Sequence, residues 1–530
     1  MRALIPIFLL MLFPVVPVMG QQPRFSIEIE EVGFPGFPGL QSFAHAQYEG
    51  KWIIVGGRTD GLHRRQPFAA FLAADNNQMI YVADIQSGEV WSRPLSDLPV
   101  PLREQLQSTN MEFVQRDSTL YLIGGYGFSA TANDHITYPQ LVAVDLPGLI
   151  GDVIQNVSMQ SRFRSLTDNR LRVTGGYLGY LDQRFYLVGG QNFQGRYNPM
   201  GPGHGPGFIQ QYTNAIKSFE IADDGTSLSI QAYQETADSL VLHRRDYNMT
   251  PQIFADSTKG FTAFSGVFQY QTDLPWLDVV DISPAGYAVD DSFRQYLNQY
   301  HSAHAELYSA GANEMYNLFF GGMSQYYPDS SGLLIEDTNV PFVRTLSLVT
   351  RFADGSRHEQ AIGTMPALLG ASAAFFPAEN LITDESGIYM LDEIPAGKTL
   401  LGYVAGGIES TQPNIFFINT GVQSDASSRI FKVSINRTTT NLDMPRQSNL
   451  SWEAGPNPAR NVVQVNLYSE NPSDGCLRLA DLSGKILWQE RVTFADEKKV
   501  SVPVKDFSEG MYLLMWCTPG RTLSRKIMLR

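Results

Sequence analysis

The stretch Trp52-Ile53-Ile54-Val55-Gly56-Gly57 is a short apolar run that ends in two glycines, and it recurs along the chain. The further copies are Leu120–Gly125, Phe185–Gly190, Leu318–Gly322 and Tyr403–Gly407, with a degenerate copy at Phe261–Gly266. Each run is too short for a helix and is rich in β-branched and aromatic residues, so each is predicted to be a strand. An internal repeat of this kind is typical of an array of similar supersecondary units.

The residues around each run complete the repeating unit. A strand-like segment precedes the double glycine, as in Ser42–Tyr48, and another follows it, as in Met79–Asp84. These patterns predict a four-stranded antiparallel sheet repeated six times, and radial stacking into a propeller would bury the faces of all six sheets. Phe25–Glu30 alternates apolar and charged residues and is predicted to be an edge strand that completes the last sheet.

The first copy carries the residues of a known repeat. Gly56-Gly57 is followed by Tyr81, Asp84 and Trp91, and this order resembles the kelch repeat. The resemblance implies an all-β chain with a six-bladed kelch-like β-propeller, which we place at residues 21–445. It implies little about function, because kelch propellers include protein-binding modules, glycan-related enzymes and oxidases.

The first twenty residues resemble an export signal. Arg2 is followed by an apolar stretch over residues 3–19, and Val18 and Gly20 precede a plausible cleavage site before Gln21. This pattern predicts a signal peptide at residues 1–20. The alternative is a membrane anchor, but the run is short and contains three prolines. No later segment is expected to cross a membrane.

The C-terminal region has its own pattern of short strands and turns. Its motifs are Pro456-Asn457-Pro458, Asp481–Lys485, Glu509–Tyr512 and Arg525–Ile527. Together they resemble the type IX secretion sorting domain of Bacteroidetes, predicted here as a small β-sandwich at residues 455–530 after a linker at 446–454. The resemblance implies delivery through the periplasm by the type IX machinery, to the cell surface or the medium. The alternative is an ordinary sandwich stalk, such as a carbohydrate-binding one.

Cysteine and charge limit the chemistry. The two cysteines, Cys476 and Cys517, both lie in the C-terminal region, and either a disulfide or two buried thiols fits the sequence. The absence of cysteine from residues 1–475 excludes the cysteine–tyrosine copper site of galactose oxidase, a kelch-like enzyme. No metal motif occurs and no cofactor is expected. The net charge of −14 disfavours nucleic acid and anionic membranes as partners.

Polar residues at one end of the predicted propeller form a candidate ligand site. At or just before the inner strands they are His45, Asn110, Arg244, Arg245, Asp246, Asn248, His304 and Ser372; in the loops after the double glycines they are Arg58, Arg64, Arg196, Tyr197 and Tyr326. Long loops on a rigid scaffold often carry function, and aromatic residues mixed with polar ones suit glycan or peptide binding. The alternative is that these residues only hydrate the channel.

Two functions follow as hypotheses. The first is a non-enzymatic surface propeller that binds a glycan or protein at the channel mouth. The second is a carbohydrate-active enzyme, such as an epimerase, mutarotase or lyase, that uses a pocket on the axis with Arg244, Asp246 and His304. No catalytic residue is identified from the sequence.

Overall fold

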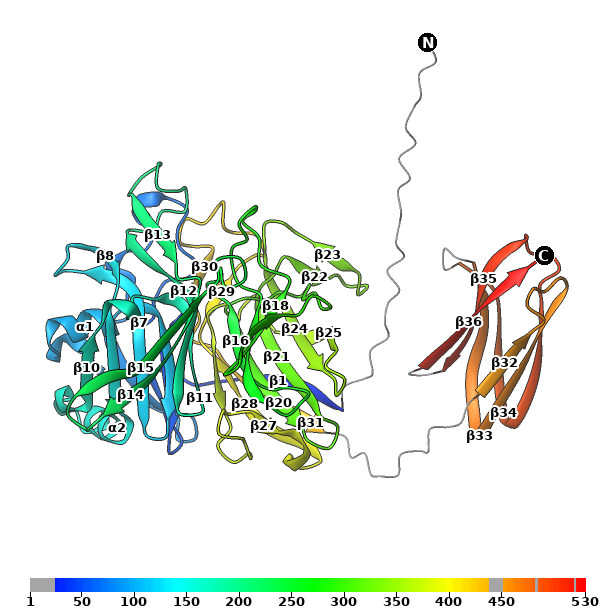
Figure 1. Ribbon diagram of the computed structural model, residues 1–530, viewed down its shortest axis with the longest axis horizontal. Coiled ribbons are helices and arrows are strands. Elements are labelled where there is room, and N and C mark those ends of the chain that lie inside the picture. Colours follow the sequence, from blue (N-terminus) through cyan, green and yellow to red (C-terminus); the bar gives the residue numbers. More distant parts are fainter. Residues whose placement is uncertain (1–23, 438–450, 482–484, 519–520) are drawn as a thin grey trace, which may run out of the picture. The chain divides into compact units, whose positions relative to one another are not determined.

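The computed structural model describes residues 24–437, 451–481, 485–518 and 521–530. Within these residues the protein is all-β, with two α-helices, α1 (Val100–Leu106) and α2 (Leu146–Ile154). The contacts divide the chain into two compact units, Met1–Thr438 and Thr439–Arg530, which Figure 1 displays. The predicted signal peptide lies outside the described residues, as do residues 446–450 of the predicted linker.

The first unit contains six sheets of four or five strands, antiparallel except for one strand pair in the fifth, and we number them I to VI in chain order. Sheet I has β2 (Ala44–Tyr48), β3 (Lys51–Val55), β4 (Met79–Asp84) and β5 (Glu89–Pro94). Sheet II has β6 (Thr109–Arg116), β7 (Thr119–Ser129), β8 (Asp134–Thr137), β9 (Gln140–Asp145) and β10 (Phe163–Thr167). Sheet III has β11 (Thr174–Leu181), β12 (Arg184–Gly195), β13 (Phe208–Tyr212), β14 (Ala215–Asp223) and β15 (Leu228–Ala237).

The other three sheets follow the same plan. Sheet IV has β16 (Asn248–Ile253), β17 (Lys259–Phe264), β18 (Val279–Ser283) and β19 (Gly286–Val289). Sheet V has β20 (Ala303–Ser309), β21 (Glu314–Met323), β24 (Phe342–Arg351) and β25 (Arg357–Thr364), with β27 (Tyr389–Met390) parallel to β20. Sheet VI has β26 (Ala374–Pro377), β28 (Gly397–Ala405), β31 (Ile430–Arg437) and β1 (Phe25–Val32). Two small ribbons, β22 (Tyr326–Pro328) with β23 (Leu334–Glu336) and β29 (Ile408–Ser410) with β30 (Ser424–Ala426), complete the unit.

The N-terminal strand pairs with the last long strand of this unit. β1 runs antiparallel to β31 from the Phe25–Arg437 pair to the Val32–Ile430 pair. The prediction that this segment completes the last sheet is therefore confirmed. The ring of Phe25 is buried against Tyr316, with ring centroids 5.3 Å apart, so β1 also contacts sheet V.

The double glycines join each sheet to the next. The amide of the second glycine donates to a carbonyl just before the first strand of the following sheet. These bonds are Gly57 to Ser108 (2.9 Å), Gly125 to Val173 (2.9 Å), Gly190 to Arg244 (2.8 Å), Gly322 to Leu369 (3.2 Å) and Gly407 to Leu40 (2.8 Å). In the degenerate copy, the hydroxyl of Ser265 donates to the carbonyl of Asn298 over 2.8 Å instead. The last of these contacts returns from sheet VI to sheet I.

Steric room explains why the first residue of each pair is glycine. Gly124 has φ +65°, and a Cβ there would overlap the carbonyl oxygen of Val173. Gly406 has φ +69°, and a Cβ there would lie 2.7 Å from the carbonyl oxygen of Leu40. Only glycine combines a left-handed backbone with so close an approach of a second chain segment. The repeat read in the sequence is thus an inter-sheet contact as well as the end of a strand.

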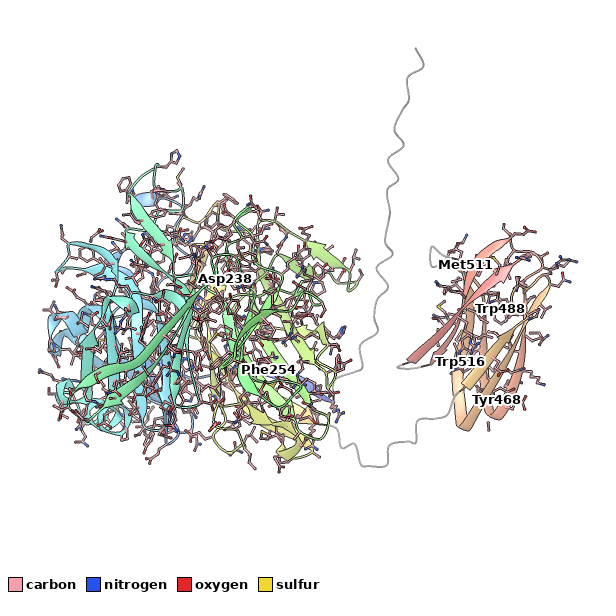
Figure 2. All side chains as sticks on the ribbon, in the orientation of Figure 1. Asp238, Phe254, Tyr468, Trp488, Met511 and Trp516 are labelled. Carbon is pink, nitrogen blue, oxygen red and sulfur yellow. The ribbon has the colours of Figure 1, made fainter. Side chains whose placement is uncertain are left out.

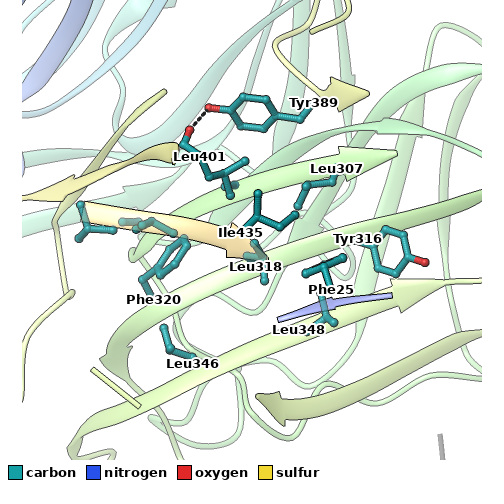
Figure 3. Close-up of a cluster of buried hydrophobic side chains, with 14 of the residues drawn as sticks. Phe25, Leu307, Tyr316, Leu318, Phe320, Leu346, Leu348, Tyr389, Leu401 and Ile435 are labelled. Atoms are coloured by element: carbon teal, nitrogen blue, oxygen red, sulfur yellow. Dashed lines mark hydrogen bonds between the residues drawn. The ribbon is translucent and has the colours of Figure 1, made fainter. Parts of the chain in front are cut away.

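The hydrophobic core lies between neighbouring sheets. Six clusters of buried side chains are each shared by two consecutive sheets: I with II, II with III, III with IV, IV with V, V with VI, and VI with I. Figure 3 shows the cluster between sheets V and VI, where Phe320 and Leu348 meet Ile435 and Leu401. Tyr389 also belongs to this cluster, and its hydroxyl donates a hydrogen bond to the carbonyl of Leu401.

The second unit is one sheet with two long strands. Its strands are β32 (Ser451–Gly455), β33 (Val462–Ala480), β34 (Ile486–Pro503), β35 (Gly510–Thr518) and β36 (Arg521–Leu529). The predicted strands Val463–Leu467 and Leu477–Asp481 belong to a single strand, β33, with a register shift between Ser469 and Ser473. Residues 451–454 were predicted to be linker, but the structure places them in β32. Trp452 of this strand is buried in the unit's core. The core also contains Val465, Leu479 and Trp516.

Candidate functional site

Six residues with a left-handed backbone mark one end of the first strands of sheets I to VI. They are Ser42, Asn110, Gly175, Asp246, His301 and Ser372, and we call them the ring residues. Four backbone hydrogen bonds link neighbours among them: Asn110 to Ser42, Ser42 to Ser372, Ser372 to His301, and Asp246 to Gly175. The hydroxyl of Thr174 donates to the carbonyl of Asn110 over 3.1 Å and links sheets II and III at the same level. These bonds bring to one level residues that are far apart in the chain.

An ion pair lies at this level. Arg245 is paired with the Asp246 carboxylate, its Nε donates to the Tyr212 hydroxyl over 3.1 Å, and its guanidinium lies over the Phe268 ring. The two charged side chains are only 15% and 17% exposed. Within the described residues, the second carboxylate oxygen of Asp246 and the side-chain oxygen of Asn110 have no hydrogen-bond partner. Buried polar atoms normally have one, and both of these oxygens lie below the surface.

Three aromatic rings form a stack beside the ion pair. The imidazole of His243 lies between Tyr212 and Tyr270, with centroid distances of 3.7 and 3.9 Å and interplanar angles of 22° and 23°. Burial, together with the nearby charge of Arg245, lowers the pKa of His243, so the ring is neutral near pH 7. Tyr270 is half exposed at the end of the stack. The stack therefore presents a flat uncharged surface next to a charged pair.

The loops after the first and third double glycines pack against each other. Arg196 donates to the carbonyl of Ala70 over 2.8 Å, Arg65 donates to the carbonyl of Pro199 over 2.6 Å, and the rings of His63 and Tyr197 are 4.7 Å apart. Burial raises the pKa of Tyr197, and the charges of Arg245 and Asp246 also act on its hydroxyl. Tyr197 thus lies near the ion pair, at the end of the sheets that the ring residues mark, which we call the ring end.

Several predicted site residues form contacts within the protein. Arg58 is buried and bonded to Asp60 and Asn76. Arg244 is ion-paired with Asp278, and the Asn248 amide bonds to the backbone of Gln299 and Ser302 between sheets IV and V. The predicted grouping of Arg244 with Asp246 and His304 is therefore not supported by the partners of Arg244.

The remaining predicted residues are dispersed. His45 lies between the rings of Phe113 and Phe376, and burial lowers its pKa to about 4. His304 is bonded to Glu306 over 2.6 Å. Arg64 borders a pocket of about 210 Å³ with Asp60, Asp75 and Asp425, and the ring of Tyr326 meets that of Tyr296. Of the predicted residues, the structure gathers Asn110, Tyr197, Arg245, Asp246 and Ser372 at the ring end.

Glu112 is a candidate that sequence reasoning missed. Its carboxyl accepts a hydrogen bond of 2.7 Å from the Gly176 amide, and its second oxygen is buried without a hydrogen-bond partner in the part of the chain that the structure describes. A Cβ on the adjacent Gly175 would lie 2.5 Å from the free oxygen of Asp246. Two carboxyl groups thus flank the Gly175-Gly176 pair. Burial raises the pKa of Glu112 to about 8. The alternation of apolar and polar residues in β6 was the only available signal.

A groove at the opposite end of sheet IV was also missed. Its volume is about 580 Å³, and it is lined by residues of sheets IV and V, among them Phe254, Tyr287 and Arg351. Phe254, labelled in Figure 2, follows β16, whereas Asp246 precedes that strand. The groove and the ring end therefore lie at opposite ends of β16. Residues 24–437, 451–481, 485–518 and 521–530 contain no group of three His, Cys, Asp or Glu side chains placed to hold a metal.

Comparison with known proteins identifies the second unit. Residues 455–530 match the family model described as the secretion system C-terminal sorting domain. No curated protein matches the chain. A solved structure described as "Structure of YjhT" matches at 11% identity over 75% of this chain and 97% of that chain, with a TM-score of 0.39. This likeness is too distant to define how the six sheets are arranged.

The sorting domain determines where the protein acts. A type IX C-terminal sorting domain directs export to the cell surface or secretion, and the predicted localisation is confirmed. In the described part of the chain, no helix is long and apolar enough to span a membrane.

Proposed function

We propose that residues 25–437 form a six-bladed kelch-like β-propeller with sheets I to VI as its blades. Three features support the proposal: the glycine contacts, the shared clusters and the ring-residue hydrogen bonds each include a link between sheets VI and I. Since Phe25 and Arg437 are register partners, a short linker would join them. A circular permutant opened at the β18–β19 turn should then fold with a similar melting temperature. An unfolded permutant would contradict the closed arrangement.

We further propose that this exported propeller binds a glycan at the ring end and is not an enzyme. The observation that carries the proposal is the Tyr212–His243–Tyr270 stack beside the Arg245–Asp246 pair. Sugar rings pack on flat aromatic faces, and their hydroxyls bond to carboxylate, amide and guanidinium groups.

The test uses a glycan array with the full chain and three variants. Tyr270→Ala removes the exposed end of the stack. Asp246→Asn replaces the carboxylate that pairs with Arg245 by an amide. Tyr296→Ala is the control, because Tyr296 is similarly exposed (42%) but contacts Tyr326 instead. Binding that is lost in the first two variants and kept in the control supports the site. Glycan binding that both variants retain would refute the proposed site. If a purified protein binds instead, and its binding is lost in the same two variants and kept in the control, the ligand is a protein rather than a glycan.

A second candidate function is acid–base chemistry on a sugar, as in an epimerase, mutarotase or lyase. It is favoured by one observation, the placement of Glu112 and Asp246 on either side of Gly175-Gly176. Because its pKa is about 8, Glu112 holds a proton at neutral pH. The Asp246 carboxylate forms an ion pair with Arg245. Such a pair suits a general acid and a general base. If a turnover is found on a sugar panel, Glu112→Gln and Asp246→Asn should each abolish it; variants with full activity would exclude this pair.

A further inference from the structure

The two cysteines of the chain lie directly opposite each other in the sorting domain. Cys476 in β33 and Cys517 in β35 are register partners of an antiparallel pair. They are 41 positions apart in the sequence (517 − 476), and the intervening segment includes β34. In register pairs of antiparallel strands, the Cβ atoms lie on the same face and about 4.5–5.5 Å apart.

The neighbouring residues show which face the thiols occupy. Leu477 and its register partner Trp516 are buried in the core of this unit, and Trp516 is labelled in Figure 2. Because side chains alternate along a strand, Cys476 and Cys517 lie on the other face. Both cysteines carry free thiols in the structure and are half-buried, so a reagent can reach them. A bond between the two sulfur atoms would not disturb the packed core.

We propose that Cys476 and Cys517 form an intramolecular disulfide in the exported protein. Disulfides span Cα atoms about 4.4–6.8 Å apart, and opposite residues of antiparallel strands lie about 4.5–5.5 Å apart. The Cα criterion is therefore met, and the bond requires the two Cβ atoms to approach to about 3.5–4.5 Å. The export that the sorting domain directs takes them to compartments where disulfides persist.

The oxidation is a thiol–disulfide exchange with a disulfide-bearing oxidoreductase or a small-molecule disulfide. One cysteine thiolate attacks a sulfur of the oxidant, forms a mixed disulfide and expels the first thiolate of the oxidant. The second cysteine thiolate attacks the first cysteine's sulfur and expels the remaining oxidant thiolate. Two protons leave the cysteines, and two electrons reduce the oxidant's disulfide to two thiol groups, which take up these protons. The product links the strands of the sheet that carry Leu477 and Trp516.

The experiment equilibrates the purified full chain with oxidised glutathione. Free thiols are then counted in denaturant, with and without prior reduction, and the intact mass is measured. We expect no free thiol before reduction, two after it, and a monomer on a non-reducing gel. Because residues 1–475 contain no cysteine, the thiol count reports this pair alone.

Thermal unfolding gives a second readout. The transition of the sorting domain should move upward by on the order of 10 °C on oxidation, while that of the first unit stays constant as an internal control. Cys476→Ser and Cys517→Ser should each abolish the shift and leave one free thiol. Two free thiols after oxidation, a glutathione adduct on each cysteine, or a disulfide found only between chains would overturn the proposal.

Discussion

The indole ring of Trp52 lies flat against the phenyl ring of Phe376, with centroids 4.1 Å apart and planes 14° apart. Trp52 belongs to β3 in sheet I, and Phe376 to β26 in sheet VI. Both are fully buried. The first and last sheets of the unit are therefore joined by aromatic packing as close as that within a single core.

This contact predicts the effect of Phe376→Ala. Removing a buried phenyl ring leaves a cavity in the cluster shared by sheets VI and I, and we expect a loss of about 3–5 kcal/mol in the free energy of unfolding. Phe68→Ala is the matched control, because Phe68 is 72% exposed and its loss should change stability by less than about 0.5 kcal/mol. Denaturant unfolding measures both. Equal stabilities of the two variants would contradict the packing described.

Deletion of residues 21–31 should expose the edge of β31. That strand pairs with β1 on one side and β28 on the other, so the deletion leaves its backbone groups unpaired on one side. Exposed edges promote association between chains. We expect a lower melting temperature and oligomers in size-exclusion chromatography. A truncated protein that stays monomeric and melts at the wild-type temperature would rule out a stabilising role for β1.

Gly124→Ala should be much more destabilising than Gly88→Ala. Both glycines have positive φ, but no atom lies within 4 Å of a Cβ built on Gly88, whereas the Val173 carbonyl overlaps one on Gly124. Gly88→Ala should cost about 1–2 kcal/mol from backbone strain alone. Gly124→Ala adds the clash with sheet III and should cost roughly 3 kcal/mol or more. The difference, measured by urea denaturation, isolates the inter-sheet contact.

The buried Glu112 should make stability depend on pH. Its pKa in the folded protein is about 8, above the ordinary 4.5, so the folded state binds the extra proton between these values. The contribution of the Glu112 proton to the free energy of unfolding is fully present below pH 4.5. It is lost as the pH rises through 8, at up to about 1.4 kcal/mol per pH unit. Glu112→Gln should flatten this decline between pH 5 and 8 relative to wild type. His45 and His63 contribute equally to both proteins, so they cancel in the difference.

Glu359 provides the matched comparison. Burial raises its pKa to about 8 as well, and it accepts a hydrogen bond from the Leu297 amide away from the ring residues. Glu359→Gln should flatten the decline to a similar degree. A Glu112→Gln protein whose pH profile parallels wild type would show that Glu112 is ionised in the folded state.

Truncation after Arg446 should separate folding from delivery. The two units have distinct cores, so the truncated protein should retain the melting temperature of the first unit. It lacks the sorting domain at 455–530 and should not reach the surface or the medium. Cell fractionation with an antibody against the first unit measures this. Truncated protein found outside the cells would contradict the role of the sorting domain.

The sequence predicted much of the repeating unit because the signals are local. Apolar runs such as Trp52–Val55 and the double glycines give strand type and strand end directly, and the pairing of Phe25–Glu30 with the last sheet followed from a missing strand. The predicted start of the sorting domain at residue 455 agrees with the family match over 455–530, whereas β32 begins earlier, at Ser451, within the predicted linker. The continuity of β33 was missed because polar residues separate its two apolar halves.

The candidate site was only partly predictable. Asn110, Arg245 and Asp246 were identified from their place before or in the first strands. Successive side chains of an extended chain point in opposite directions, so Arg244 and its neighbour Arg245 have different partners, Asp278 and Tyr212. The sequence alone does not show which of the two arginines faces which partner. The Tyr212–His243–Tyr270 stack was missed because its rings come from three separate segments.

The pairing of β1 with β31 has a consequence for the order of events in the cell. Ribosomes make Phe25 long before Arg437, so sheet VI cannot form until nearly the whole first unit has been synthesised. The sorting domain begins only 18 residues after Arg437 (455 − 437). A polypeptide whose translation stops before β31 therefore lacks both the pairing partner of β1 and the sorting domain. Completion of sheet VI and synthesis of the sorting domain are therefore late and nearly simultaneous events.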